Sequence, residues 1–122
     1  MNLQTLPQAF SVCQIPDLSQ VDFTRPYVFL SKTDEELSLV CETGAVPQAT
    51  LAREDGWRAL RVQGVLEFSL VGILASLSTI LAQAGISIFA VSTYNTDYLL
   101  TKGTDFSHAC AVLSGAGYAI LE

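Results

Sequence analysis

The sequence predicts a small α+β protein, because a helical period gives way to a strand period in its second half. Apolar residues recur at helical spacing over 73–84, and Gly85 follows where a helix commonly ends. Residues 86–91 then alternate, with the β-branched and aromatic side chains that favour a strand. The polar turn residues 94–97 and the apolar run after them complete a hairpin.

Further elements flank this stretch on both sides. Residues 57–65 alternate as a strand, and Ser69 is a suitable N-cap for the first helix. Thr104 is placed to cap a second helix, and 118–121 form a closing apolar strand. The second helix has Asp105 in its first turn and a buried face of Phe106, Ala109, Cys110 and Leu113. Residues 57–121 therefore predict strand, helix, strand, strand, helix, strand, with both helices on one face of an antiparallel sheet.

The front half predicts strands but no helix of comparable strength. Residues 9–15 alternate as a strand, and 27–31 pairs with 36–41 across the turn residues 33–35. Between them, 17–21 is compatible with a helical turn or a loop. Residues 42–56 mix glycine, proline and charged residues without a hydrophobic period, so we expect a surface connection there. We place the boundary between the two halves of the chain in this segment.

The helix, followed by G-I-S-I-F at 85–89 and S-T-Y-N-T-D-Y-L-L at 92–100, resembles the ACT domain. It is most similar to the ACT variant of the CASTOR arginine sensors and of lysine-regulated aspartate kinases, and the similarity extends to 29–33, 36–40 and 57–60. The resemblance implies a ferredoxin-like βαββαβ ACT domain over 57–122, preceded by a shortened ACT-like, β-rich half over 1–56.

The resemblance also implies a ligand site, because related ACT domains hold a free amino acid at an interface between two such units. The matching positions are the helix start, the following strand and its turn, namely Gly72, Ser87, Ile88, Thr93, Tyr94, Asn95 and Asp97. Backbone N–H groups at the helix start suit an α-carboxylate, and Asp97 can pair with an α-ammonium group. Gly72 would leave room for close approach. The alternative interpretation of 94–97 is plain turn chemistry.

The family pattern also bears on assembly. The arginine sensors carry two such double units per chain, whereas this sequence has one, and it has no catalytic domain for an ACT domain to regulate. Ligand contact across two units would then need a homodimer, which we expect, or the front half as partner. The protein that it would regulate is not identified by the sequence.

An enzyme is not expected, because the sequence offers no catalytic group in a recognisable setting. His108 is the only histidine and falls away from the buried face of its predicted helix. No G-x-S-x-G turn or glycine-rich phosphate loop is present, so neither a catalytic triad nor a nucleotide cofactor is predicted. The carboxylates at 34–36 fit a solvated turn better than a metal site, and we expect no metal and no cofactor.

Composition limits the partners further. A net charge of −6 disfavours nucleic acid and anionic membranes, which both attract clustered Lys and Arg. Residues 68–96 carry no charge, but their polar side chains and the change of period at Gly85 argue against a membrane span. Three widely separated cysteines, Cys13, Cys41 and Cys110, and no secretory signal predict reduced thiols, mostly buried, in the cytoplasm.

The function that the sequence favours is a stand-alone sensor or regulatory protein that binds a free amino acid at an ACT-type interface. The competing function is a structural dimerisation module without a working ligand site. Affinity for free amino acids distinguishes the two.

Overall fold

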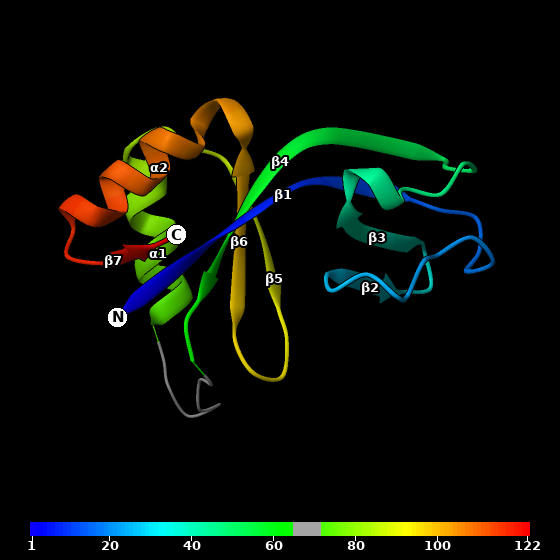
Figure 1. Cartoon of the computed structure of the whole chain (residues 1–122), viewed down its shortest axis with the longest axis horizontal. Coiled ribbons are helices and arrows are strands. Elements are labelled where there is room, and N and C mark those ends of the chain that lie inside the picture. The colour runs from blue at the N-terminus through cyan, green and yellow to red at the C-terminus, as the bar shows by residue number, and fades with distance from the viewer. Residues whose placement is uncertain (65–71) are drawn as a thin grey trace. The chain divides into compact units, whose positions relative to one another are not determined.

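A computed structural model describes residues 1–64 and 72–122, which form two compact units. The helical unit consists of Met1–Pro7 and Arg58–Glu122, and the strand unit consists of Gln8–Trp57. The elements in chain order are β1 (Asn2–Gln14), β2 (Val28–Lys32), β3 (Leu37–Glu42), the 3-10 turn η1 (Thr43–Ala45), β4 (Ala52–Val62), α1 (Ile73–Gln83), β5 (Ile88–Ser92), β6 (Asp97–Lys102), α2 (Gly103–Gly115) and β7 (Ala119–Leu121). The strands β1 and β4 each contribute to both units (Figure 1).

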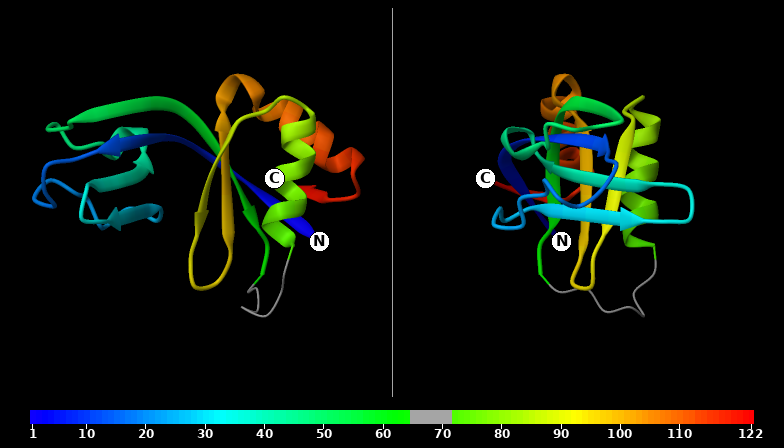
Figure 2. Two further views of the ribbon diagram at one scale, coloured as in Figure 1. Left: turned by 180° about the vertical axis from the view of Figure 1, so that it is seen from behind. Right: turned by 90° about the vertical axis from the view of Figure 1, so that its right-hand side faces the viewer.

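The helical unit has the predicted α+β, ferredoxin-like fold. Its strands are ordered β7-β1-β4-β6-β5, and α1 and α2 pack together on one face of this sheet (Figures 1 and 2). Side chains from both helices and from the strands meet in one apolar core. Its most buried members are Leu3, Leu60, Val62, Leu77, Leu81, Leu99, Ala109 and Leu113. Burial of these large apolar side chains is the main stabilising term for this unit.

The N-terminal strand is the main departure from the expected topology. It begins at Asn2, not near residue 9, and its first part lies between β7 and β4. The Gln63 amide donates to the Asn2 carbonyl oxygen at 2.9 Å, and Leu3 lies opposite Ile120 in a parallel pairing with β7. Pro7 interrupts the alternating pattern, which is why the sequence did not indicate so long a strand. The division into halves at 1–56 and 57–122 stays a prediction, to which the structure adds that Met1–Pro7 packs with the second.

The helix ends differ in part from expectation. Gly85 follows α1 with a φ of +75°, as a left-handed helix stop requires. The helix α2 begins at Gly103 with Lys102 at its N-cap, and no side chain caps it, so the predicted Thr104 cap is wrong. Strand β6 passes directly into α2, which leaves no free residue before the helix for a capping side chain. The predicted Ser69 cap lies outside the described residues.

The buried face of α2 was predicted well. Phe106, Ala109 and Leu113 are buried, and His108 is exposed, as their spacing indicates. Asp105 lies in the first turn, where a carboxylate favours the helix dipole. Cys110 is only partly buried.

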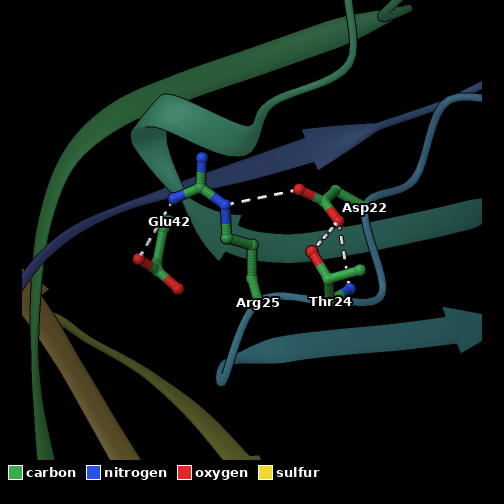
Figure 3. Close-up of polar contacts among 4 residues, drawn as sticks. All are labelled: Asp22, Thr24, Arg25 and Glu42. Atoms are coloured by element: carbon green, nitrogen blue, oxygen red, sulfur yellow. Dashed lines mark hydrogen bonds and ion pairs between the residues drawn. The ribbon is translucent and has the colours of Figure 1, made fainter.

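The strand unit orders its strands β2-β3-β1-β4 and has no α-helix among its residues. The segment between β1 and β2 is a series of turns held by an arginine. Arg25 Nε lies 3.3 Å from Asp22 Oδ2, and its Nη1 lies 3.6 Å from Glu42 Oε1 at the end of β3 (Figure 3). The Thr24 amide donates to the other Asp22 oxygen at 3.0 Å. These contacts hold the segment against β3. In the helical unit, a helix takes the place of this segment before the equivalent hairpin.

The predicted surface connection over 42–56 is partly wrong, because β4 already begins at Ala52. Its first residues are exposed and charged, and Arg53 Nε contacts Asp55 Oδ1 at 2.8 Å. Ser11 on β1 donates to the same Asp55 oxygen at 2.6 Å. A strand that is solvated at this end shows no apolar alternation, so its start could not be read from a hydrophobic period.

The two hairpins are equivalent in register. Val28 lies opposite Cys41 in the first, and Ile88 opposite Thr101 in the second, so each partner lies 60 residues later in the chain. The same shift holds for all five described pairs of each hairpin, and β3 and β6 have the same pattern of burial. The structure therefore reveals a repeat that the residue identities conceal.

The three cysteines are free thiols, as predicted. Cys13 and Cys41 are buried in the core of the strand unit, whereas Cys110 is half-buried, which is less than expected. Burial raises the pKa of the Cys41 thiol to about 11, and the neighbouring Cys13 contributes in the same direction. Within the described residues, neither helix is both long and apolar enough to cross a membrane.

Candidate functional site

The turn between β5 and β6 contains three of the predicted ligand residues. The Thr93 amide and hydroxyl both donate to the Thr96 carbonyl oxygen, at 2.9 and 3.1 Å, and close the turn. Tyr94 and Asn95 stand at its tip, and the Tyr94 side chain is 78% exposed. A large aromatic group this exposed can contact a ligand or a second molecule, although turn residues are commonly exposed in any case.

Asp97 lies at the start of β6, half-buried, opposite Ser92 on β5. The Ser92 hydroxyl donates to Asp97 Oδ1 at 2.6 Å. This cross-strand bond fixes the orientation of the carboxylate, because a hydrogen bond to a charged acceptor is short and strong. Ser92 was not among the predicted site residues, and its hydroxyl directly before the turn was the only signal for it.

Thr96 anchors the turn to the neighbouring strand. Its side chain is buried, and its hydroxyl donates to the Val62 carbonyl oxygen at the end of β4, at 2.7 Å. A buried carbonyl at a strand end needs such a donor, since leaving it unpaired is costly. The turn is therefore positioned by β4 as well as by its own hairpin. The sequence suggested only turn chemistry at this residue.

Gly72 lies directly before α1 and has a φ of +82°. Its carbonyl oxygen accepts the Ser76 amide at 2.8 Å, and no heavy atom of a described residue other than its chain neighbours lies within 4 Å of a Cβ placed there. The start of α1 and the tip of the β5–β6 hairpin lie at the same end of the helical unit in every view (Figures 1 and 2). The structure thus places Gly72 at the same end as Thr93, Tyr94, Asn95 and Asp97.

The remaining predicted residues, Ser87 and Ile88, lie at the opposite end of β5. Ser87 is exposed and Ile88 is half-buried at the first position of the strand. Five residue-to-residue steps of extended chain lead from Ile88 to Thr93, which corresponds to roughly 16 Å. A free amino acid is too short to contact both ends of β5 in one copy. The full predicted set can therefore meet one ligand only where a second unit or copy supplies the other end.

The equivalent hairpin of the strand unit lacks the chemistry of this turn. At the same register, Leu37 stands in place of Asp97, and Lys32 in place of Ser92. Thr33 keeps the turn-closing role, since its amide donates to the Glu36 carbonyl oxygen at 2.9 Å. Both hairpins share the turn geometry. Of the two, only the β5–β6 hairpin has the oriented carboxylate.

The part of the chain that the structure describes contains no cluster of residues that would suggest a metal site. No group of three or more His, Cys, Asp or Glu side chains there is arranged to hold an ion. The site as described offers a carboxylate, turn hydroxyls and helix-start amides, which are binding groups.

Similar solved structures agree with this architecture. The protein Atu0741 from Agobacterium tumefaciens is 30% identical, with a TM-score of 0.87, covering 98% of this chain and 91% of that one. Three more distant structures share the fold. VC0802 from Vibrio cholerae, a protein of unknown function, is 19% identical, with a TM-score of 0.72 over 92% of this chain and 86% of its own.

The other two are aspartate kinases. A structure of aspartokinase α and β subunits is 17% identical, with a TM-score of 0.68 over 95% of this chain and 97% of that one. The aspartate kinase of Clostridium acetobutylicum is 17% identical, with a TM-score of 0.63 over 89% of this chain and 33% of its own.

Curated protein sequences gave no match. A family model described as the ACT domain matches residues 52–115, which is more than half of the chain. This segment contains β4, α1, β5, β6 and α2, the elements that carry the candidate site. The chain therefore belongs to the ACT domain family.

Proposed function

We propose that this protein binds a free amino acid at an ACT-type interface and acts as a stand-alone sensor or regulator. The observation that carries the proposal is the carboxylate of Asp97, held by Ser92 at the same end of the helical unit as the start of α1. An oriented carboxylate suits an α-ammonium group, and the first amides of a helix suit an α-carboxylate. Both charged groups of an amino acid thus have a counterpart at one end of the unit.

The start of α1 supports this role. Among the described residues no side chain caps the helix, so none of these side chains would compete with a ligand for its first-turn N–H groups. Apart from its chain neighbours, no described residue lies within 4 Å of a Cβ placed at Gly72. A side chain at Gly72 would be strained by its positive φ as well as occupying that space.

The similarity to aspartate kinases supports a regulatory use of the site. One of the similar structures is described as an allosteric enzyme, and this chain matches a third of its length. We propose that the site belongs to the type found in CASTOR arginine sensors and lysine-regulated aspartate kinases. Arginine and lysine are accordingly the first two amino acids to test.

A homodimer would complete the site. Ser87 and Ile88 are too far from the turn to meet the same ligand in one copy, and a second copy could bring its β5 start to the first copy's turn. Among the described strands, β5 is the last of its sheet order, and the outer edge of such a strand can pair with another chain. We propose that the dimer works in the cytoplasm on a protein partner, without nucleic acid, membrane or cofactor.

The second candidate function is a dimerisation module without a working ligand site. It is favoured by one observation, namely that Ser92 already satisfies one Asp97 oxygen. In that case Asp97 would serve the hairpin alone, and the edge of β5 would serve subunit pairing.

A thermal-shift screen of the twenty amino acids tests the proposal. A ligand that binds only the folded state raises the melting temperature by mass action, and a hundredfold excess over Kd adds about 2.7 kcal/mol. We expect one or a few related amino acids to raise it and the others to have no effect. No shift with any amino acid, together with a stable dimer, would favour the dimerisation module.

A further inference from the structure

A hollow of the helical unit lies away from the candidate amino-acid site. It has a volume of about 630 Å³ and is lined from β1, β4, α2 and the C-terminal strand region. All of its lining residues belong to the helical unit, and none is among the predicted amino-acid ligands. Its size is typical of hollows that hold a small organic molecule.

Arg58 supplies the positive charge of this hollow. Its Nη2 donates to the Leu6 carbonyl oxygen at 3.1 Å, and its guanidinium carbon lies 4.4 Å from the centroid of the Phe106 ring. These two contacts fix the plane of the guanidinium group, since both the carbonyl and the ring constrain it. The group is thus held in one orientation beside the hollow.

The Nε of Arg58 is buried and has no acceptor among the described residues. A buried donor without a partner is unfavourable, so an acceptor supplied by a ligand would relieve an existing cost. A guanidinium edge that presents Nε and a neighbouring N–H matches the two oxygens of a carboxylate. The unpaired donor is therefore the observation that points to a ligand.

A negative charge lines the same hollow. Glu122 and Cys110 line it together with Arg58. Burial raises the pKa of the Cys110 thiol, Arg58 lowers it and Glu122 raises it, which indicates that both charged groups act on the same space. Glu122 would repel a ligand with two negative charges more strongly than one with a single charge, which can still pair with Arg58.

We propose that this hollow binds a small organic monocarboxylate. Its carboxylate accepts hydrogen bonds from Arg58, its carbon body lies against Phe106 and Pro7, and the hydroxyl of Ser107 is available to a second polar group. Glu122 selects against dianions such as phosphate esters. This site shares no residue with the proposed amino-acid site, so either can fail without the other.

The test uses benzoate as the charged probe and benzamide as its neutral match. The Nε–H signal of Arg58 is followed by NMR in the full chain. We expect benzoate to shift this signal saturably with a Kd on the order of 1 mM, and benzamide to bind at least about fivefold more weakly. No saturable shift up to about 20 mM benzoate, or equal effects of the two probes, would overturn the proposal.

Variants test which charged side chain determines the affinity for benzoate. Arg58→Lys keeps the charge but removes the Nε donor, and should weaken benzoate about tenfold. Arg61→Lys, the same change three residues along β4, should leave the affinity unchanged. Glu122→Gln removes the opposing charge and should tighten benzoate about threefold. Unchanged affinity in both Arg58→Lys and Glu122→Gln would show that the hollow does not bind the probe through these residues.

Alkylation of Cys110 is measured without any variant, so it does not depend on whether the arginine variants fold. Iodoacetamide modification is measured by mass spectrometry with and without benzoate. Benzoate should slow the modification of Cys110 and leave Cys13, buried in the other unit, unaffected. An unchanged rate at Cys110 with benzoate at saturating concentration would contradict occupation of the hollow.

Discussion

Ser92 and Asp97 face each other across the second hairpin, and the serine hydroxyl donates to the aspartate at 2.6 Å. This bond leaves the second carboxylate oxygen for other partners, because a carboxylate can accept several hydrogen bonds. The hairpin thereby presents a charge whose direction is set before a ligand arrives. Such preorganisation reduces the entropy lost on binding.

Removing the Asp97 charge should weaken ligand binding and leave the fold intact. Asp97→Asn keeps the shape and the Ser92 contact, but replaces an ion-pair partner by a neutral group. We expect a loss on the order of 2 kcal/mol, roughly thirtyfold in affinity, by calorimetric titration. Asp105→Asn, the same change in the first turn of α2, is the matched control and should bind as the wild type does. Equal affinities for Asp97→Asn and the wild type would mean that Asp97 serves only the hairpin.

The Thr96 hydroxyl should contribute to stability. Thr96→Val removes a buried donor and leaves the Val62 carbonyl oxygen without it, so we expect a loss of about 1–2 kcal/mol in the free energy of unfolding. Urea denaturation measures this. Thr104→Val, at an exposed position of α2, serves as the control and should change stability by less than about 0.5 kcal/mol. A loss of the same size in both variants would contradict the anchoring role of Thr96.

The buried thiol of Cys41 predicts a pH dependence. Its folded pKa of about 11 lies above the ordinary value of 9.0, so folding favours the protonated thiol. This contribution is fully present below pH 9 and is lost as the pH rises toward 11. We expect the free energy of unfolding to fall less steeply between pH 9 and 11 in Cys41→Ala than in the wild type, measured by urea denaturation at each pH. Parallel slopes would show that Cys41 does not contribute.

The predicted homodimer can be tested by light scattering at micromolar concentrations. Ala90 is exposed on the edge strand β5, where proline would remove a backbone donor needed for pairing with another chain. We expect a dimer for the wild type and a monomer for Ala90→Pro. Because Leu30 is the residue of the first hairpin at the same register, Leu30→Pro is the control and should leave the dimer unchanged. A monomeric wild type would remove the second copy that the proposed site requires.

Much of the helical unit could be predicted because the periods of its apolar residues are clear. The spacing of Leu77 and Leu81 in α1, and of Phe106 and Leu113 in α2, follows directly from one buried face per helix. The start of β4 was hidden because its first residues are charged and solvated, and the early start of β1 was hidden by Pro7. Pairings between distant segments, such as Asn2 to Gln4 beside β7, leave no local signal in one sequence.

The candidate site was also predictable only in part. The turn residues follow from Asn and Asp chemistry, and the structure confirms a turn closed by Thr93. The contacts that fix the turn, from Ser92 to Asp97 and from Thr96 to Val62, join residues whose partnership depends on strand register. Register is set by pairing across the sheet and could not be deduced from the order of residues.

The most direct test of the proposed function is a calorimetric titration of the wild-type protein with arginine, with lysine and then with any amino acid found in the thermal-shift screen. The account predicts saturable binding of at least one of them, with a stoichiometry of one ligand for each Asp97 side chain and a loss of about thirtyfold in Asp97→Asn. Absence of heat and of thermal shift with all twenty amino acids, for a protein shown to be folded, would contradict it.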